Sequence, residues 1–402
     1  MVRRRAARPG RAAEGWRHPG RHRRPRQRPH LARHRPHPRT GAGACGGRGH
    51  GPDRPLRLRR RGHQHRDPSG PARGRTGKEL PVIPKLELHL HLEGAAPPDL
   101  IRALAREKHV DLSGIFDDRG HYAYDSFAAF LRVYEAACTV LQTPDDFARL
   151  TRTVLERSAA QGVIYTEAFL SPDFCGQRDV SAWREYLHAI REAAQSAPDI
   201  QMRGIVTCIR HFGPDAARET ALCAAETAGD FLTGFGIAGD ESAGHPRDFA
   251  YGFDMAREAG LSLTAHAGEW GGAQSVRDAL DHLRVARIGH GVHAINDPAL
   301  VDRLAEDGIT LEVCPGSNVT LGVYPDWRSH PIDKLRAAGV PVTVSTDDPP
   351  FFHTTMTHEY QRLSDTFGWD DEIFTDIART AANAAFCDDA TRAALLKRIG
   401  AG

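Results

Sequence analysis

Two histidines separated by a single residue lie in the segment His89-Leu90-His91. The surrounding residues predict a β-strand, and side chains at positions i and i+2 of a strand point to the same side. Both imidazoles therefore face one site, as a pair of metal ligands would. In a chain with 22 histidines such a pair is a weak signal by itself, so its meaning depends on what accompanies it.

Three further segments place ionisable side chains where a predicted strand ends. These segments are His266-Ala267-Gly268-Glu269, Gly289-His290-Gly291 and Thr346-Asp347-Asp348-Pro349. Each has an ordinary structural explanation, because aspartates cap helices, histidines pack in cores and glutamates occupy solvated loops. Their occurrence together at strand ends is typical of an active site instead.

Three neutral imidazoles and one carboxylate are a ligand set that suits Zn²⁺ when no thiolate is offered. The predicted set consists of His89, His91, His266 and Asp347. Zinc lowers the pKa of a water molecule toward neutrality and so prepares a nucleophile. His290 is then the imidazole left to act on the water proton, and Glu269 is the acid placed to protonate an electrophile. The pattern predicts metal-dependent hydrolysis with one zinc ion per chain.

Short β-rich runs alternate with helical patterns from Leu86 onward, which predicts a parallel sheet with crossover helices. The predicted strands are Leu86–His91, Val163–Phe169, Gly204–Ile209, Gly234–Ala238, Leu261–Ala265, Val285–Gly289, Ile309–Cys314 and Val340–Thr346. Eight strands close a (β/α)8 TIM barrel, an α/β fold whose catalytic groups lie at the C-terminal ends of the strands. All of the segments described above would therefore meet at one mouth.

The predicted helices carry their own start and stop signals. Thr143-Pro144 supplies an N-cap and a first-turn proline, and Gly162 ends the helix before the second strand. Between the first two strands lies a long helical insertion, residues 94 to 162, at the end of the barrel where such folds keep their lids. The C-terminal part, from about Asp371, is predicted to form closing helices.

The first 77 residues differ in composition from the rest of the chain. They are rich in arginine, contain no lysine and hold only three acidic residues, Glu14, Asp53 and Asp67. Their few apolar side chains cannot bury enough surface to offset the entropy of ordering. We predict a disordered tail or a mis-assigned start over residues 1–77 and a barrel over residues 78–402. A nucleic-acid-binding arm is the alternative interpretation of the tail.

The cysteines and the hydropathy pattern bear on the compartment. The seven cysteines are odd in number and form no C-x-x-C pair, which argues against a disulfide framework and against a cysteine zinc site. No apolar run approaches the ~18 residues that a membrane span requires. We therefore predict a cytoplasmic protein.

Five strings occur in an order and spacing that resemble the adenosine deaminase-like family of the amidohydrolase superfamily. They are LELHLHLEG, GIAGDE, TAHAGE, RIGHG and STDDP, and the resemblance runs from about Leu86 to the closing helices. It implies zinc-dependent hydrolytic deamination of an adenine-containing purine, with the zinc held by the four ligands named above.

The resemblance also implies roles for individual residues. Glu269 would protonate the purine ring nitrogen beside the attacked carbon, and His290 would orient or deprotonate the water. Asp348 would contact the five-membered ring, and the backbone at Gly239 would contact the opposite ring nitrogen. The ligands Asp347 and His91 would also touch the water and the substrate.

One position departs from the pattern of adenosine deaminases. They usually carry an aspartate two residues after the second histidine, which binds the ribose 5′-hydroxyl, whereas this sequence has Glu93. A glutamate there resembles the adenine deaminase and aminodeoxyfutalosine deaminase branches. We expect Glu93 still to reach the hydroxyl, so that adenosine and 2′-deoxyadenosine are the substrates. Adenine or another adenine derivative is the alternative.

Other classes of function fit less well. The segment Gly234–Gly239 satisfies G-x-G-x-x-G, but it spans a predicted strand instead of following one, which argues against a dinucleotide site. A different barrel hydrolase with two metals would need a bridging lysine or carboxylate, and no lysine lies at the ends of strands two to five. A noncatalytic binder would not need a complete set of acid, base and ligands. The expected partners are a small purine and water, without membrane or nucleic acid.

Overall fold

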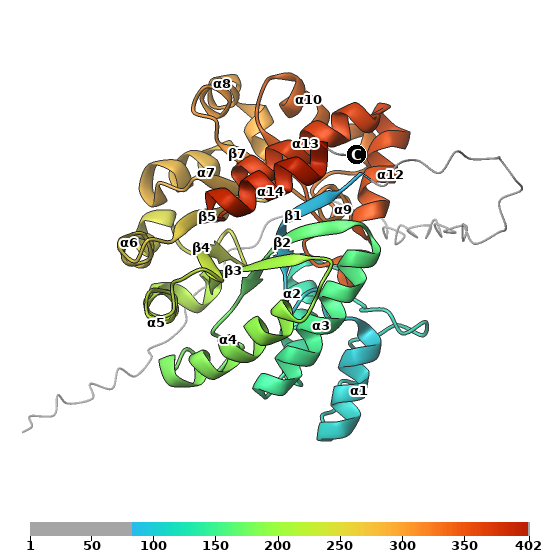
Figure 1. Cartoon of the computed structure of the whole chain (residues 1–402), viewed down its shortest axis with the longest axis vertical. Helices are drawn as coiled ribbons and strands as arrows, with labels where there is room; N and C mark the ends of the chain where they lie inside the picture. The colour runs from blue at the N-terminus through green and yellow to red at the C-terminus, as the bar shows by residue number, and fades with distance from the viewer. Residues whose placement is uncertain (1–82, 401–402) are drawn as a thin grey trace, which may run out of the picture. The chain divides into compact units, whose positions relative to one another are not determined.

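The computed structural model describes residues 83–400, and the expectations about residues 1–77 lie outside that range. Eight parallel strands follow one another in chain order, each paired with the next (Figure 1). They are β1 (Lys85–His91), β2 (Val163–Leu170), β3 (Gln201–Ile209), β4 (Leu232–Ala238), β5 (Ser262–Ala267), β6 (Arg287–His290), β7 (Thr310–Val313) and β8 (Val342–Val344). Strands arranged in this way and separated by helices form the predicted (β/α)8 barrel, so the fold prediction is confirmed.

The barrel closes at the residues predicted to carry the chemistry. Leu90 of β1 and Asp347, which follows β8, form an isolated parallel bridge. The backbone N–H of His91 donates to the carbonyl of Asp347 at 3.0 Å, and the N–H of Asp347 donates to the carbonyl of His89 at 3.1 Å. The seam between the first and last strands therefore holds three of the four predicted zinc ligands.

Strand ends differ from the predicted ones by a few residues. β5 continues to Ala267, which pairs with His290 of β6, so His266 lies within the strand and not after it. β8 stops at Val344, which leaves Thr346 outside. Pairing with the neighbouring strand decides where a strand ends, and this pairing cannot be seen in a single run of residues.

Helices surround the strands in Figure 1. They are α1 (Pro98–Lys108), α2 (Phe127–Cys138), α3 (Pro144–Ala160), α4 (Val180–Gln195), α5 (Gly213–Ala225), α6 (Ala250–Glu258), α7 (Gly272–Asp278), α8 (Pro298–Glu306), α9 (Pro315–Thr320), α10 (Ile332–Ala337), α11 (Pro349–Phe352), α12 (Met356–Phe367), α13 (Asp371–Ala384) and α14 (Asp389–Gly400). Helices α1 to α3 form the predicted insertion after β1, and α13 and α14 are the closing helices. None of the helices within residues 83–400 is long and apolar enough to cross a bilayer.

Helix α3 illustrates how local sequence sets these elements. The Thr143 hydroxyl accepts from the backbone N–H of Asp146, whose carboxylate accepts in return from the Thr143 N–H, a capping box. Phe147, Leu150 and Val154 lie on one face and are buried. The predicted start of this helix is confirmed.

A layer of charged side chains crosses the interior of the barrel. Arg287 of β6 donates from Nε to Glu312 of β7 at 2.6 Å, and its guanidinium forms an ion pair with Glu167 of β2 at 2.7 Å. None of the three is more than 1% exposed. The guanidinium also lies 3.5 Å from the ring centroid of Phe386. Since buried charges are costly unless paired, removing one member would leave the others uncompensated.

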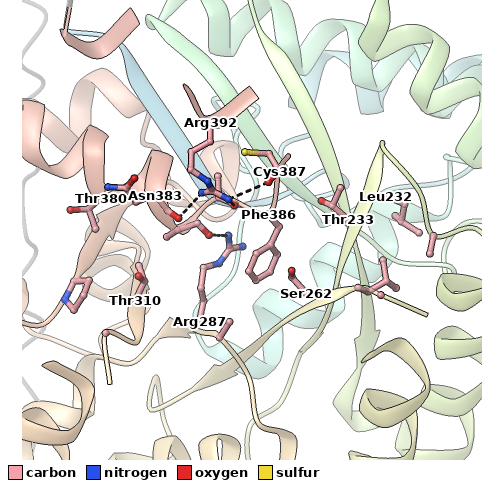
Figure 2. Close-up of a pocket in the computed structure, with 18 of the residues that line it drawn as sticks. Leu232, Thr233, Ser262, Arg287, Thr310, Thr380, Asn383, Phe386, Cys387 and Arg392 are labelled. Atoms are coloured by element: carbon pink, nitrogen blue, oxygen red, sulfur yellow. Dashed lines mark hydrogen bonds between the residues drawn. The ribbon is translucent and has the colours of Figure 1, made fainter. Parts of the chain in front are cut away.

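A cavity of about 830 Å³ lies where the strands begin, at the end opposite the predicted site (Figure 2). The two arginines that line it donate to backbone carbonyls: Arg287 to that of Ala384 at 2.9 Å, and Arg392 to that of Asn383 at 2.6 Å. None of the clusters of metal-ligating residues found within residues 83–400 lines this cavity. Although it is the larger space, none of the predicted site residues lines it.

Candidate active site

The four predicted zinc ligands converge at the carboxyl ends of the strands. His89 and His91 come from β1, His266 from β5, and Asp347 from the segment after β8. One donor atom from each lies within 4.8 Å of the others. The Nε2 atoms of His91 and His266 are 3.2 Å apart, and Asp347 Oδ1 lies 3.3 Å from His91 Nε2 and 3.5 Å from His89 Nε2.

The protonation chemistry of this cluster suits a cation. His89 donates from Nδ1 to Glu312 at 2.7 Å, which turns Nε2 toward the cluster, where this buried atom has no hydrogen-bond partner. Burial lowers the pKa of His91 to about 3 and that of His266 well below its usual value, so both rings keep a free lone pair. Burial alone would also lower the pKa of His89, but Asp347 and Glu312 raise it to about 9, so a metal bound at Nε2 would displace a proton there. The unpaired Nε2 of His89, the neutral rings of the other two histidines and the carboxylate together supply the ligands that zinc needs.

Asp347 is held in place from several directions. Its backbone adopts φ of 65°, an uncommon left-handed conformation for a residue other than glycine, as does His290 with φ of 60°. The Ser317 hydroxyl donates to Asp347 Oδ2 at 2.8 Å. Burial alone would raise the pKa of Asp347, but the neighbouring histidines hold it well below its usual range. The carboxylate is therefore ionised and oriented.

His290 has a chain of partners behind it. Asn318 donates from its amide nitrogen to His290 Nδ1 at 3.2 Å, and the amide oxygen of Asn318 lies 3.2 Å from His330 Nε2. Since Nδ1 accepts, the proton of the neutral ring lies on Nε2. That atom is 3.9 Å from both Glu269 Oε2 and Asp347 Oδ2. Burial lowers the pKa of His290 to about 4, so the ring is neutral.

Glu269 and Asp348 are buried carboxyl groups that line the same cavity as Asp347. Burial, followed by the charge of Asp347, raises the pKa of both well above the usual range, which favours the protonated form of each. Glu269 Oε1 and Asp348 Oδ1 lack hydrogen-bond partners. The space that Asp348 occupies requires Gly94, where a Cβ atom would lie 1.5 Å from Asp348 Oδ1. Both groups can thus donate a proton or a hydrogen bond to a ligand.

A cavity of about 70 Å³ opens between these groups and the insertion. The predicted site residues that line it are His91, Gly239, His266, Glu269, His290, Asp347 and Asp348. Aromatic side chains of the insertion, including Phe127, Phe130 and Tyr134 of α2, complete the wall. Gly239 has φ of 95°, and a Cβ atom there would lie 2.7 Å from His211 Nδ1, so glycine is needed at this position.

Two predicted site residues, His89 and Glu93, do not line the cavity, and Glu93 is the one that was expected to bind the substrate. Its carboxylate accepts from the backbone N–H of Ser171 at 3.2 Å and lies 4.0 Å from Cys175 Sγ. It is only 3% exposed, and burial raises its pKa to about 7. The side chain therefore packs against the end of β2.

Several supporting residues were not identified as such from the sequence. Glu312 orients His89, Ser317 orients Asp347, and Asn318 orients His290. Glu312 lies within β7, whereas Ser317 and Asn318 lie in α9 just after it, at the end of the barrel where loops carry functional groups.

Comparison with known proteins places this geometry in a family. The family model described as "Adenosine deaminase" matches residues 84–401. Proteins named adenine deaminase from Chelativorans sp. (strain BNC1) and Rhizobium rhizogenes are 49% and 50% identical to this chain. The matches cover 79% of this chain and 98% and 99% of those proteins, respectively.

Solved structures agree with this placement. The crystal structure of adenine deaminase from Arthrobacter aurescens is 32% identical, with a TM-score of 0.73, and the match covers 79% of this chain and 98% of that one. An amidohydrolase from Burkhoderia ambifaria, solved with bound Zn, is 29% identical, with a TM-score of 0.70, over 82% of this chain and 98% of that one. Because the family model matches nearly all of the described residues and the relatives are about 50% identical, the chain belongs to the adenosine deaminase family, within the amidohydrolase superfamily. It is a hydrolytic deaminase of adenine-containing purines.

Proposed function

We propose that this protein is a zinc-dependent adenine deaminase, which converts adenine and water to hypoxanthine and ammonia. The observation that carries the proposal is that relatives about 50% identical over nearly their whole length are named adenine deaminase. These relatives do not support the expected preference for adenosine, and they fit the alternative, adenine, better.

The zinc would be held by His89, His91, His266 and Asp347. The unpaired Nε2 of His89 and the neutral rings of its neighbours fit a metal with nitrogen and oxygen ligands. When bound, zinc supplies Lewis-acid activation of a water molecule. A related structure with bound Zn supports this choice of metal.

The surrounding residues would divide the proton chemistry between them. Glu269, whose buried position favours the protonated form, would hold the proton that the purine ring nitrogen takes up as the neighbouring carbon is attacked. His290 carries its own proton on Nε2, which favours orienting the water over removing its proton. Asp348 and the backbone N–H of Gly239 line the cavity and would bind the remaining ring nitrogens.

The position of Glu93 supports the free base over the nucleoside. A ribose needs a partner for its 5′-hydroxyl, and the carboxylate that was expected to supply one is turned toward Ser171. The cavity of about 70 Å³ is also far smaller than the ~300–1000 Å³ of sites that enclose larger ligands. Aromatic side chains of α2 line this small cavity.

The test is a steady-state comparison of adenine, adenosine and 2′-deoxyadenosine with enzyme that carries about one zinc ion per chain. We expect kcat/KM for adenine to exceed that for either nucleoside by at least ~100-fold, because an unpaired ribose hydroxyl is costly to bury. The Glu269→Gln variant controls for contaminating deaminases. Equal use of base and nucleoside, or a preference for adenosine, would reject the proposal. The cytoplasmic location stays a prediction.

A further inference from the structure

We propose that Glu241 is the positioning residue for the catalytic acid, because its carboxylate holds the backbone of the segment Gly268–Gly271 that carries Glu269. This inference rests on the proposed function for the role of Glu269. Glu241 lies just beyond β4, whereas the segment it binds follows β5. It touches neither the cavity nor the zinc ligands through its side chain.

The carboxylate of Glu241 accepts hydrogen bonds from four consecutive backbone N–H groups. The donors are Gly268 to Oε1 at 2.5 Å and Glu269, Trp270 and Gly271 to Oε2 at 3.1, 2.7 and 2.9 Å. The Ser275 hydroxyl donates to Oε1 as well. Successive N–H groups that converge on one anion form a nest. Here the single carboxylate of Glu241 fixes the backbone of four consecutive residues.

The nest suits a buried negative charge. Glu241 is 8% exposed, and burial alone would raise the pKa of its carboxyl, but Ser275 and the backbone donors lower it. The segment also leads into the N-terminus of α7, where N–H groups lack helical partners and favour an anion. A Cβ atom on Gly271 would lie 2.7 Å from Glu241 Oε1, so this glycine permits the close approach.

A second contact ties the same residue to the metal side of the site. Arg210, 2% exposed, donates from Nη1 to the Glu241 carbonyl at 2.9 Å and from Nη2 to the His266 carbonyl at 3.3 Å. Glu241 is therefore anchored to the strand that carries a zinc ligand. Its side chain in turn fixes the segment Gly268–Gly271 that follows this strand.

Glu269 depends on this arrangement because its own carboxyl is not fixed by hydrogen bonds. Oε1 has no partner, and Oε2 lies 3.9 Å from His290 Nε2, which is beyond hydrogen-bonding distance. Its location is thus set by the backbone from Gly268 to Gly271. Displacing a catalytic group by about 1 Å costs up to ~100-fold in rate, so loosening the nest should slow proton delivery without removing the zinc.

The first experiment measures backbone amide hydrogen exchange in the zinc-loaded protein and needs no substrate. In Glu241→Gln the amides of residues 268–271 should exchange at least ~10-fold faster, because one acceptor oxygen is replaced by a donor. The matched control is Asp240→Asn, whose carboxylate accepts only from Ser242, and which should leave these amides protected. Unchanged exchange in Glu241→Gln would overturn the proposal.

The second experiment is a double-mutant cycle with Glu269→Gln, using the purine that the enzyme turns over best. We expect Glu241→Gln to lower kcat ~10–100-fold with little change in KM. In the Glu269→Gln background the same substitution should lower kcat by less than ~2-fold. An equal loss in both backgrounds would show a general structural role and overturn the assignment. If Glu241→Gln does not fold, Glu241→Asp keeps the charge and should give the same non-additivity. Absence of purine turnover would reject the proposed function, while the exchange result would still decide the positioning role.

Discussion

Replacing Glu312 with glutamine should weaken both the fold and the zinc site. Glu312 is fully buried and accepts from His89 Nδ1 at 2.7 Å, Thr264 Oγ1 at 2.8 Å and Arg287 Nε at 2.6 Å. An amide of the same shape has one acceptor oxygen in place of two, and its NH₂ group would face a donor. It also leaves the Arg287 guanidinium with only one counter-charge.

The expected loss follows from the pKa of the carboxyl. Burial alone would raise it, but Arg287 and the hydrogen bond from His89 lower it from 4.5 to about 2. At 1.36 kcal/mol per pKa unit, this shift corresponds to about 3 kcal/mol of stability near neutral pH. That agrees with the ~3–5 kcal/mol seen when one partner of a buried ion pair is removed. For a barrel of this size it corresponds to a melting temperature lower by about 5 °C.

The dependence on pH has a definite sign. A carboxyl whose pKa is depressed by folding contributes its full stability above its unfolded pKa of 4.5, and the contribution is lost as pH falls toward 2. The difference between wild type and Glu312→Gln should therefore be constant from pH 6 to 8 and shrink below about pH 4.5.

Urea unfolding, followed by circular dichroism with and without a chelator, measures the stability difference, and a competition titration measures zinc affinity. Loss of the partner that orients His89 should weaken zinc binding ~10–100-fold. The exposed residue Glu306 of α8 supplies the control, since Glu306→Gln should change stability by less than about 0.5 kcal/mol. The reasoning fails if Glu312→Gln keeps wild-type stability and zinc affinity.

Three further predictions concern single residues. His266→Ala should lose zinc and turnover together, and stoichiometric zinc by metal analysis in an active variant would contradict the ligand assignment. Glu269→Gln should keep one zinc and the fold but lose at least ~100-fold in kcat, whereas loss of the metal would make it a ligand. Burial raises the pKa of Glu359 from 4.5 to about 8, so its contribution to stability is complete below pH 4.5 and is lost as pH rises through about 8. In urea unfolding, the free energy of unfolding of Glu359→Gln should fall less steeply between pH 4.5 and 8 than that of the wild type. The same slope in both proteins would contradict the assignment.

The sequence was sufficient for the elements and for the inner site because the evidence for both is local. Strand and helix periodicity, caps such as Thr143 and the exit of each strand can be recognised within a few residues. In a parallel barrel every strand ends at the same mouth. His89, His266 and Asp347 could therefore be grouped without knowing their distances, and the structure brings them together.

The supporting contacts could not be predicted because they join residues far apart in the chain. Glu312 meets His89 across 223 positions, and Ser317 meets Asp347 from a neighbouring strand end. Which side chains oppose each other across the barrel depends on strand register and tilt, and these are set by the packing of the whole sheet. The nest around Glu241 similarly requires two loops to be adjacent.

Glu93 shows the same limit most directly. Its place in the motif, two residues after His91, determines that it lies at the mouth of the barrel. Whether its carboxylate faces the ligand or the wall depends on where an unpaired N–H is available, and the structure places that of Ser171 within 3.2 Å. Sequence alone determined which side chains could form the proposed zinc site, because the ligand types and their strand ends are local. Only the tertiary structure decided how much room remains beside it, because that depends on side chains brought together from β1, β2 and α2.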